Sequence, residues 1–149
     1  MKIRILSVGK KHESWVSQGI EQFLKRLRPP FSAEMVIVPN SSRPDSARQD
    51  ESDKLSKYIS PDSWVILLDE RGSNLSSPEL ADHITSHVDK QIVIIIGGAY
   101  GVSDELRERA DLVWSLSRLV FPHQLVRLIL AEQLYRAQEI SRGSGYHHD

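Results

Sequence analysis

Ile92-Val93-Ile94-Ile95-Ile96-Gly97-Gly98-Ala99-Tyr100-Gly101 is the stretch that decides the fold. Its first five residues are β-branched and show no polar alternation, which is typical of a strand buried on both faces of a parallel sheet. Three glycines follow within five residues, where that strand must end. Ligands of open α/β sheets bind beyond the carboxyl ends of the strands, and glycine lets the backbone approach a ligand closely. The stretch therefore predicts a ligand-binding loop, with an ordinary strand-to-helix connection as the alternative.

The rest of the chain alternates strand-like and helix-like segments around that strand. This alternation predicts an α/β fold with a mainly parallel sheet and helices on both faces. Because neither a repeat nor a linker interrupts it, residues 1–149 are expected to form one domain. The polar segment 40–53 is expected to be a mobile loop or the exposed start of a helix that continues to Tyr58. Strands are expected at 3–8, 35–38, 64–68, 92–96 and 112–114, and helices at 15–27, 77–88, 104–109 and 124–141.

Serines mark the starts of two of these helices. Ser77 is placed to cap the helix at 77–88, with Pro78 at its first helical position. Ser103 is placed to cap the helix at 104–109, where Asp104 and Glu105 in the first turn complement the helix dipole. Both helices are therefore expected to begin at a side-chain cap.

The last helix is apolar over an arc too wide for a single core face. A helix of this kind needs a second surface to cover it. We expect that surface to be a second copy of the chain in a homodimer, with deeper burial inside one protomer as the alternative. The apolar positions are Leu125, Val126, Leu128, Ile129, Leu130, Ala131, Leu134 and Ala137.

Composition limits the classes of function. The chain has no cysteine, which excludes disulfides, thiolate catalysis and cysteine–zinc sites. Its 19 basic and 20 acidic residues give a formal net charge of -1, so any RNA contact must come from a local basic patch or from a surface shared across an oligomer. We expect no signal peptide and no membrane-spanning segment, and the lack of cysteine fits a cytoplasmic location.

The common catalytic and phosphate-binding motifs do not match. The spacing of the glycines differs from the dinucleotide fingerprint, and no Gly-Lys-Ser/Thr follows them. The histidines form no metal signature, so no metal site is expected. Asp69 ends a strand, but Arg71 stands where a phosphatase would have a second aspartate, so we expect a structural or substrate-gating role for Asp69. A flavodoxin-type nucleotide-binding protein is a weaker alternative, because the chain offers no phosphate loop.

Three strand ends are instead expected to converge on one crevice. These ends are Leu68-Asp69, Gly97-Gly98 and the run from Leu116 to Phe121. Their side chains are mostly apolar or absent, and their backbone groups are available for hydrogen bonding. This combination suits a ligand with an adenine ring and polar edges. It suits a triphosphate poorly, because no lysine or arginine lies in the glycine turn.

Short motifs along the whole chain carry a family resemblance. In their order and spacing they resemble the small bacterial SPOUT-class methyltransferases of the ribosomal RNA large subunit methyltransferase H family, which methylate N3 of a pseudouridine. Departures are Val120 in place of the usual threonine, Gly145 in place of proline and His148 in place of a basic residue. The motifs are Ser7-Val8-Gly9-Lys10, Leu68-Asp69-x-x-Gly72 with Leu75-Ser76-Ser77, Gly97-Gly98-x-x-Gly101, Trp114-Ser115-Leu116-Ser117, Phe121-Pro122-His123-Gln124-Leu125-Val126-Arg127, Glu132-Gln133-Leu134-Tyr135-Arg136-Ala137 and Tyr146-His147.

The resemblance implies a C-terminal trefoil knot that binds S-adenosylmethionine, and an obligate homodimer. The implied substrate is 23S ribosomal RNA, in the large subunit or in the assembled ribosome. His147 is the implied catalytic group at the acceptor nitrogen, and Tyr146 the stacking or hydrogen-bonding partner of the base. A non-catalytic RNA- or ribosome-binding module on the same fold is the alternative, and calorimetry with S-adenosylmethionine distinguishes the two. The implied cofactor-binding residues are Leu68, Gly97, Leu116, Ser117, Arg118, Leu119, Val120 and Phe121.

The basic residues are candidates for RNA contact, although each is also an ordinary surface charge. His123 and Arg127 are expected to shape the pocket or the dimer rather than to touch RNA. The candidate phosphate contacts are Lys10, Lys11, Lys25, Arg26, Arg136 and Arg142.

Overall fold

The computed structural model describes residues 2–148 and contains one five-stranded sheet. The strand order is β2-β1-β4-β3-β5, and every neighbouring pair is parallel. The sequence-based expectation of a mainly parallel sheet is therefore confirmed. The strands are β1 (Ile3–Val8), β2 (Ala33–Val38), β3 (Ser63–Asn74), β4 (Gln91–Ile96) and β5 (Leu112–Ser115).

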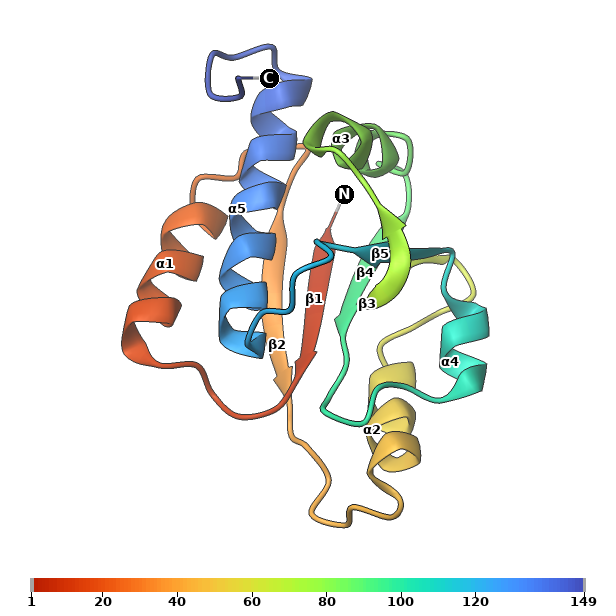
Figure 1. Cartoon of the computed structure of the whole chain (residues 1–149). Coiled ribbons are helices and arrows are strands. Elements are labelled where there is room, and N and C mark those ends of the chain that lie inside the picture. Colours follow the sequence, from red (N-terminus) through yellow and green to blue (C-terminus); the bar gives the residue numbers. More distant parts are fainter. Residues whose placement is uncertain (1, 149) are drawn as a thin grey trace.

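Helices cover both faces of this sheet, as Figure 1 shows. One face is covered by α1, α3 and α5, and α5 lies between the other two and contacts both. The other face is covered by α2 and α4. The expected arrangement with helices on both faces is thus also confirmed. The helices are α1 (Ser14–Leu24), α2 (Ala47–Ser56), α3 (Ser77–Thr85), α4 (Asp104–Arg109) and α5 (His123–Ser141).

The β-branched strand β4 lies at the centre of the sheet, between β1 and β3. Ile92, Ile94 and Ile96 pack into the apolar cluster beneath α3 and α5, whereas Val93 and Ile95 pack into the cluster beneath α2 and α4. Successive side chains of a strand point to opposite faces, so a strand covered on both sides needs apolar residues at every position. The uninterrupted run of β-branched residues follows from this position.

Several boundaries differ from those expected from the sequence. The helix expected to end at Leu27 ends at Leu24, although Leu27 is still buried. Of the two alternatives for the polar segment that begins at Asn40, the structure has the helix: α2 ends at Ser56 rather than at Tyr58, and it buries Ala47, Glu51, Ser52 and Leu55. β3 continues six residues beyond Leu68, through an irregularity in its pairing with β5. The residues after Leu68 show no strand-like hydrophobic pattern, and for this reason the sequence predicts a strand that ends at Leu68.

The caps of the two short helices were predicted with mixed success. Ser103 caps α4 as expected, because its hydroxyl accepts a hydrogen bond from the Leu106 N–H at 3.2 Å. The cap of α3 is Ser76, which accepts from the Glu79 N–H, and the prediction of Ser77 is wrong. Ser77 begins the helix and donates its hydroxyl to Gln133 of α5 at 2.7 Å. Adjacent serines are equally good caps by type, and only the path of the backbone selects one.

The wide apolar arc of α5 is partly covered within the chain. Leu130, Ala131, Leu134 and Ala137 are fully buried against the sheet and the neighbouring helices. Leu125 and Ile129 are only half-buried and belong to none of the apolar clusters found among residues 2–148. Deeper burial within the protomer therefore accounts for one side of the helix and leaves these two residues unexplained.

No helix in the described part of the chain is both long enough and apolar enough to cross a membrane.

Candidate functional site

A cavity of about 550 Å³ lies at the carboxyl ends of β4 and β5 and beside the irregular stretch of β3 that follows Leu68. The three strand ends that the sequence singled out all contribute to its walls, so their expected convergence is confirmed. His123 and Val126 of α5 close one side of the cavity. The lining residues are 67–71, 96–102, 115–117, 119–121, His123 and Val126.

Most of the implied cofactor-binding residues meet at this cavity, but one does not. Arg118 lies in the same loop as its neighbours, is exposed and is not among the lining residues. The residues that do line the cavity are Leu68, Gly97, Leu116, Ser117, Leu119, Val120 and Phe121.

The glycine loop forms one wall through a tight turn. The Gly101 N–H donates to the Gly98 carbonyl at 3.0 Å, and Gly101 has a φ of 76°, a conformation that favours glycine. A Cβ placed on Gly98 would lie 2.5 Å from Oε1 of Glu51 and 3.1 Å from Val8. The backbone at Gly98 therefore lies directly against a buried carboxylate and has no room for a side chain.

Glu51 of α2 packs against the backbone of this wall at Gly98. It is 3% exposed, and its Oε2 accepts a hydrogen bond from the Ser41 N–H at 2.8 Å. Its Oε1 has no hydrogen-bond partner among the described residues. Nothing in the sequence pattern distinguishes Glu51 from the surrounding polar residues, so its contact with the glycine loop could not be predicted.

The opposite wall is the segment between β5 and α5, which is held by its own hydrogen bonds. The Ser115 hydroxyl donates to the Ser117 carbonyl at 2.9 Å, and the Ser117 hydroxyl accepts from the Leu119 N–H at 3.0 Å. Leu119 and Val120 follow at the rim of the cavity, where they are 70% and 80% exposed. The mouth of the cavity therefore presents uncovered apolar surface, which is typical of a binding site.

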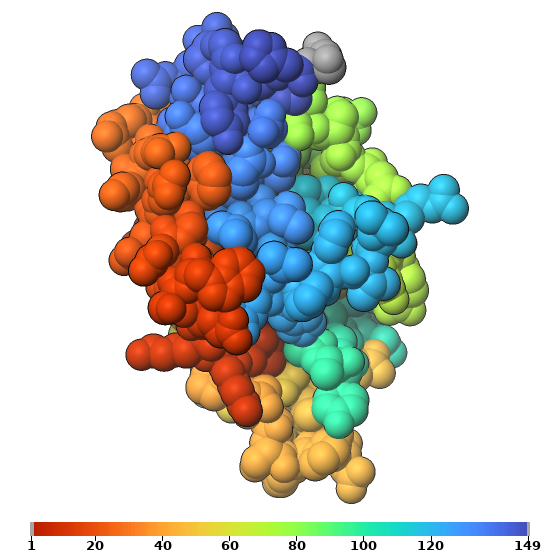
Figure 2. All heavy atoms as spheres, turned by 60° about the vertical axis from the view of Figure 1, so that its left-hand side comes forward, coloured from red at the N-terminus to blue at the C-terminus, as the bar shows by residue number. Residues whose placement is uncertain are grey.

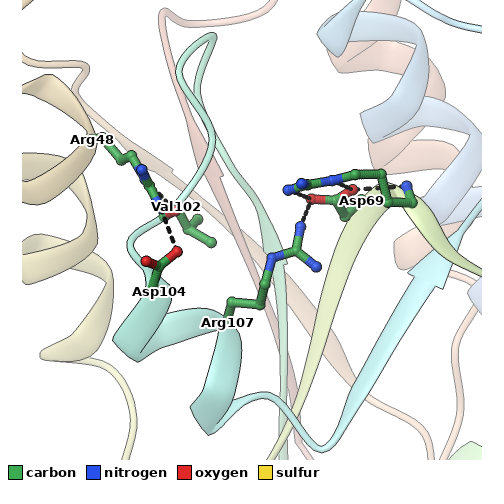
Figure 3. Close-up of polar contacts among 6 residues, drawn as sticks. Arg48, Asp69, Val102, Asp104 and Arg107 are labelled. Atoms are coloured by element: carbon green, nitrogen blue, oxygen red, sulfur yellow. Dashed lines mark hydrogen bonds and ion pairs between the residues drawn. The ribbon is translucent and has the colours of Figure 1, made fainter.

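Arginines from α2 and α4 fix the region around the glycine loop (Figure 3). Arg107 of α4 forms an ion pair with Asp69 at the end of the regular part of β3. Arg48 of α2 donates to the Val102 carbonyl at 2.7 Å and to Asp104 at 2.6 Å. The loop is thus tied to α2 on one side and, through α4, to β3 on the other.

Asp69 has the structural role that was one of its two expected roles. Burial raises the pKa of its carboxyl, but hydrogen bonds from Arg71 and the positive charges of Arg107 and Arg71 outweigh burial, so the net pKa is lowered. Asp69 is therefore ionised at neutral pH and lies at the cavity wall as one half of an ion pair.

The residues implied as catalytic lie elsewhere, on the C-terminal tail. The Tyr146 hydroxyl donates to Glu132 at 2.8 Å, and its ring meets the Tyr135 ring edge-on at 4.9 Å. The guanidinium of Arg136 lies over the same ring, 4.8 Å from its centroid, and its Nη1 is 3.1 Å from Nδ1 of His147. Burial, followed by the contact with Glu132, raises the pKa of Tyr146. The tail is therefore bound to α5; its last residue, Asp149, lies outside the described residues.

The cavity and the tail are at opposite ends of α5. His123 at the start of the helix lines the cavity, whereas the tail is held at Glu132 and Arg136. At a rise of 1.5 Å per residue, Arg136 is about 20 Å along the helix axis from His123. Figure 1 shows the tail at the C-terminal end of α5 and the segment from β5 at the other end. Within this chain, neither Tyr146 nor His147 lines the cavity.

The chemistry of the cavity fits an adenine-bearing cofactor. Its walls combine the apolar side chains of Leu116, Leu119 and Val120 with the side-chain-free backbone of Gly97 and Gly98. Such a site recognises a flat, apolar ring with polar edges through main-chain donors and acceptors. Its volume of about 550 Å³ is within the usual range for small-molecule sites.

Comparisons with known proteins cover almost the whole chain. A family model described as "Predicted SPOUT methyltransferase" matches residues 1–147. The protein named ribosomal RNA large subunit methyltransferase H from Geobacter metallireducens is 42% identical over 153 residues, which cover 99% of both chains. A protein of the same name from Geobacter sulfurreducens is 42% identical over 153 residues, which cover 99% of this chain and 100% of that protein. Another, from Carboxydothermus hydrogenoformans, is 41% identical over 158 residues, which cover 99% of both chains.

Proposed function

The chain belongs to the SPOUT methyltransferase family, and on that premise we propose that it transfers a methyl group from S-adenosylmethionine to ribosomal RNA of the large subunit. The observation that carries this proposal is the cavity at the ends of β4 and β5 and beside the irregular stretch of β3, whose apolar and main-chain lining fits an adenine-bearing cofactor. The substrate class comes from the names of the full-length relatives. A ribosomal substrate places the activity in the cytoplasm.

We propose that the acceptor is N3 of a pseudouridine in 23S ribosomal RNA. When bound, S-adenosylmethionine supplies a methyl group already activated on a sulfonium, so the residues of the chain mainly have to orient the base and assist loss of the N3 proton. Tyr146 supplies an aromatic ring for the base on the side that Arg136 does not cover, and His147 follows it on the tail. Stacking of a base on an aromatic side chain is the usual way in which proteins hold an unpaired nucleotide.

The contact with Arg136 defines the role of His147 more closely. A guanidinium only donates hydrogen bonds, so Nδ1 of His147 is the acceptor of the 3.1 Å contact. Neutral His147 then carries its proton on Nε2. We therefore propose that His147 presents an N–H to the pseudouridine and stabilises the negative charge that develops on it, while the N3 proton passes to water.

A homodimer brings the two halves of the site together. The cavity and the tail are about 20 Å apart along α5, so two α5 helices that pack antiparallel would place the tail of one protomer at the cavity of its partner. The apolar side chains that support such a contact are exposed or half-buried along this side of the chain, namely Leu119, Val120, Leu125 and Ile129. Figure 2 shows this side of the molecule, with α5 in blue between α1 and the segment that precedes α5.

We further propose that residues 1–149 form a single SPOUT domain with a C-terminal trefoil knot around the cofactor cavity. The support is the family match over residues 1–147 and the resemblance of the motifs at Gly97 and Phe121.

Transfer of tritiated methyl groups from S-adenosylmethionine to large ribosomal subunits and whole ribosomes tests the function. The particles come from a strain that lacks the modification, prepared with and without prior pseudouridine formation. We expect transfer only to particles that contain pseudouridine. Transfer to both preparations would refute the proposed base. Binding to ribosomes without transfer, together with no calorimetric binding of S-adenosylmethionine, would instead identify a non-catalytic RNA-binding module.

A further inference from the structure

Arg127 is a buried cation without an acidic partner. It is 2% exposed, and no carboxylate of residues 2–148 forms an ion pair with it. Its guanidinium donates to the Ser7 hydroxyl at 2.7 Å, to the Lys10 carbonyl at 2.9 Å and to Nδ1 of His12 at 3.3 Å. These neutral acceptors bind Nε and Nη1 of the guanidinium but leave its charge uncompensated, which is unusual for a buried charged group.

The acceptors belong to the loop between β1 and α1, residues 9–13, which is itself basic. Lys10 and Lys11 are exposed, and His12 is half-buried beside the guanidinium. Burial and the charge of Arg127 lower the pKa of His12, so its neutral ring accepts the hydrogen bond at neutral pH. Glu13 is the acidic residue of the loop, and its carboxylate already accepts from the Trp15 indole at 2.7 Å.

Specific contacts with α5 hold the loop 9–13 in place. Gly9 has a φ of 139°, and a Cβ there would lie 3.1 Å from Nη2 of Arg127, so glycine lets the backbone lie against the guanidinium. The Glu13 N–H donates to the Gln124 side chain at 2.8 Å. In Figure 2 the loop, in red, and the start of α5, in light blue, lie side by side on one exposed face.

The ends of two helices add to the positive potential. Both α1 and α5 begin at this surface, and neither has a side-chain cap. The N-cap residue of α1 is Glu13, so one carboxylate lies at that end, whereas the first turn of α5 has no acidic residue. The N-terminus of a helix carries a partial positive charge that attracts anions. Together with Arg127 and the two lysines, these ends make a local positive field on a chain whose formal net charge is -1.

We infer that Lys10 and Lys11 of the loop 9–13 bind a backbone phosphate of the RNA beside the cofactor cavity, and that the buried Arg127 holds this loop in place and adds its positive charge beneath it. The cofactor carboxylate does not explain the charge, because neither Arg127 nor any residue of the loop lines the cavity. His123, one helical turn before Arg127, does line the cavity, so the site lies next to its mouth. Phosphate contacts of this kind set the position of a nucleic acid on a protein without reading its sequence. The inference rests on the proposed function.

The test is the salt dependence of binding to large ribosomal subunits. The variant Lys10→Gln/Lys11→Gln removes two exposed charges and keeps the backbone contact between Lys10 and Arg127. Lys57→Gln/Lys90→Gln is the matched control, because it removes two exposed lysines from other parts of the surface. Affinity is measured by filter binding over a range of salt concentrations, and affinity for S-adenosylhomocysteine by calorimetry.

We expect the loop variant to reduce the slope of log affinity against log salt concentration by about one to two, and the control to leave it unchanged. Calorimetric affinity for S-adenosylhomocysteine should be the same in both variants. An unchanged slope in the loop variant, or a loss of cofactor affinity in it, would overturn the phosphate site. Failure of the wild-type protein to bind or methylate the particles would instead refute the proposed function.

Discussion

At the scale of single residues, two sets of contacts fix the walls of the cavity. Gly98 lies against Oε1 of Glu51 and the side chain of Val8. Asp69 is held by Arg107 from α4 and by Arg71 from its own strand. The first contact fixes the glycine loop, and the second fixes the end of the neighbouring strand. Both sides of the cavity are thus preorganised by contacts that do not involve the ligand.

Gly98→Ala tests the first of these contacts. The new Cβ would lie 2.5 Å from the Glu51 carboxylate, so the loop or the side chain must shift. We expect calorimetric affinity for S-adenosylmethionine to fall at least about tenfold, with a loss of about 1–3 kcal/mol in stability. Gly145→Ala is the control, because a Cβ there meets nothing within 4 Å. Wild-type affinity in a folded Gly98→Ala protein would exclude the glycine loop from the site.

Asp69→Asn tests the second contact through its pH dependence. The lowered pKa of Asp69 means that its ion pair stabilises the folded state above the ordinary aspartate pKa, and that this stability is lost as the pH falls through the lowered value. At neutral pH we expect the variant to be less stable by about 1–3 kcal/mol, since Arg107 loses its partner. Denaturant unfolding is measured at neutral pH and at a pH below the lowered pKa of Asp69. The difference in the free energy of unfolding between the wild type and the variant should be smaller at the lower pH.

Asp104→Asn is the matched control for Asp69→Asn, because it breaks the neighbouring ion pair with Arg48 (Figure 3). The Asp104 side chain is 87% exposed, and an exposed pair contributes little to stability. We expect a much smaller effect at every pH. Equal effects of the two substitutions would show that the ion pair of Asp69 has no special structural role.

At the scale of elements, α5 connects every part of the site. Its first turn lines the cavity and its middle is buried between α1 and α3. Its outward side carries Leu125, Ile129, Glu132 and Arg136, at the spacing that aligns residues on one face of a helix. The first two are apolar and the last two hold the tail. This division predicts that the apolar half of the face is the part that a second protomer covers.

Ile129→Glu tests that prediction. A charge on the outward face should dissociate the dimer in sedimentation experiments while leaving the protomer folded, because Ile129 is only half-buried. Leu130→Glu should instead unfold the chain, since Leu130 is 0% exposed and a buried charge is strongly unfavourable. Val88→Glu, at an exposed apolar residue after α3, is the control for the dimer. A wild-type protein that sediments as a monomer would contradict the dimer directly.

Sequence patterns predict an element well where its side chains are buried on both faces, or on one face at a regular spacing. The run from Ile92 to Ile96 identified the central strand, because only a strand covered on both faces requires β-branched residues throughout. Patterns failed where the outcome depends on contacts between residues distant in the chain. Asp69 pairs with Arg107, and Arg127 with Ser7, across 38 and 120 positions, and no local periodicity reports such contacts.

For the C-terminal tail, the sequence predicts the functional motif but not its position. Its motif, Tyr146-His147, was implied as functional by the family resemblance alone. Its position on Glu132 and Arg136 depends on the direction in which the chain turns after Gly143, which has a φ of 68°. Composition alone describes the same residues as a polar end of the chain.

At the scale of the whole molecule, we propose that each methyl-transfer centre is made from two protomers. The cavity at the start of α5 would come from one chain, and the tail held at the other end of α5 from its partner. Each protomer would then contribute to both centres of a symmetric dimer. This arrangement predicts that two defects placed on different chains complement each other.

Mixed dimers of Gly98→Ala and His147→Ala test this claim most directly. Each variant alone should lose most methyl transfer to ribosomes, the first through its cavity and the second through its tail. Dimers with one chain of each kind, isolated by two affinity tags, contain one centre with an intact cavity and an intact tail. We predict that they recover about half of the wild-type rate, since the dimer has two equivalent centres. Mixed dimers as inactive as their parents would show that the cavity and tail of the same chain act together.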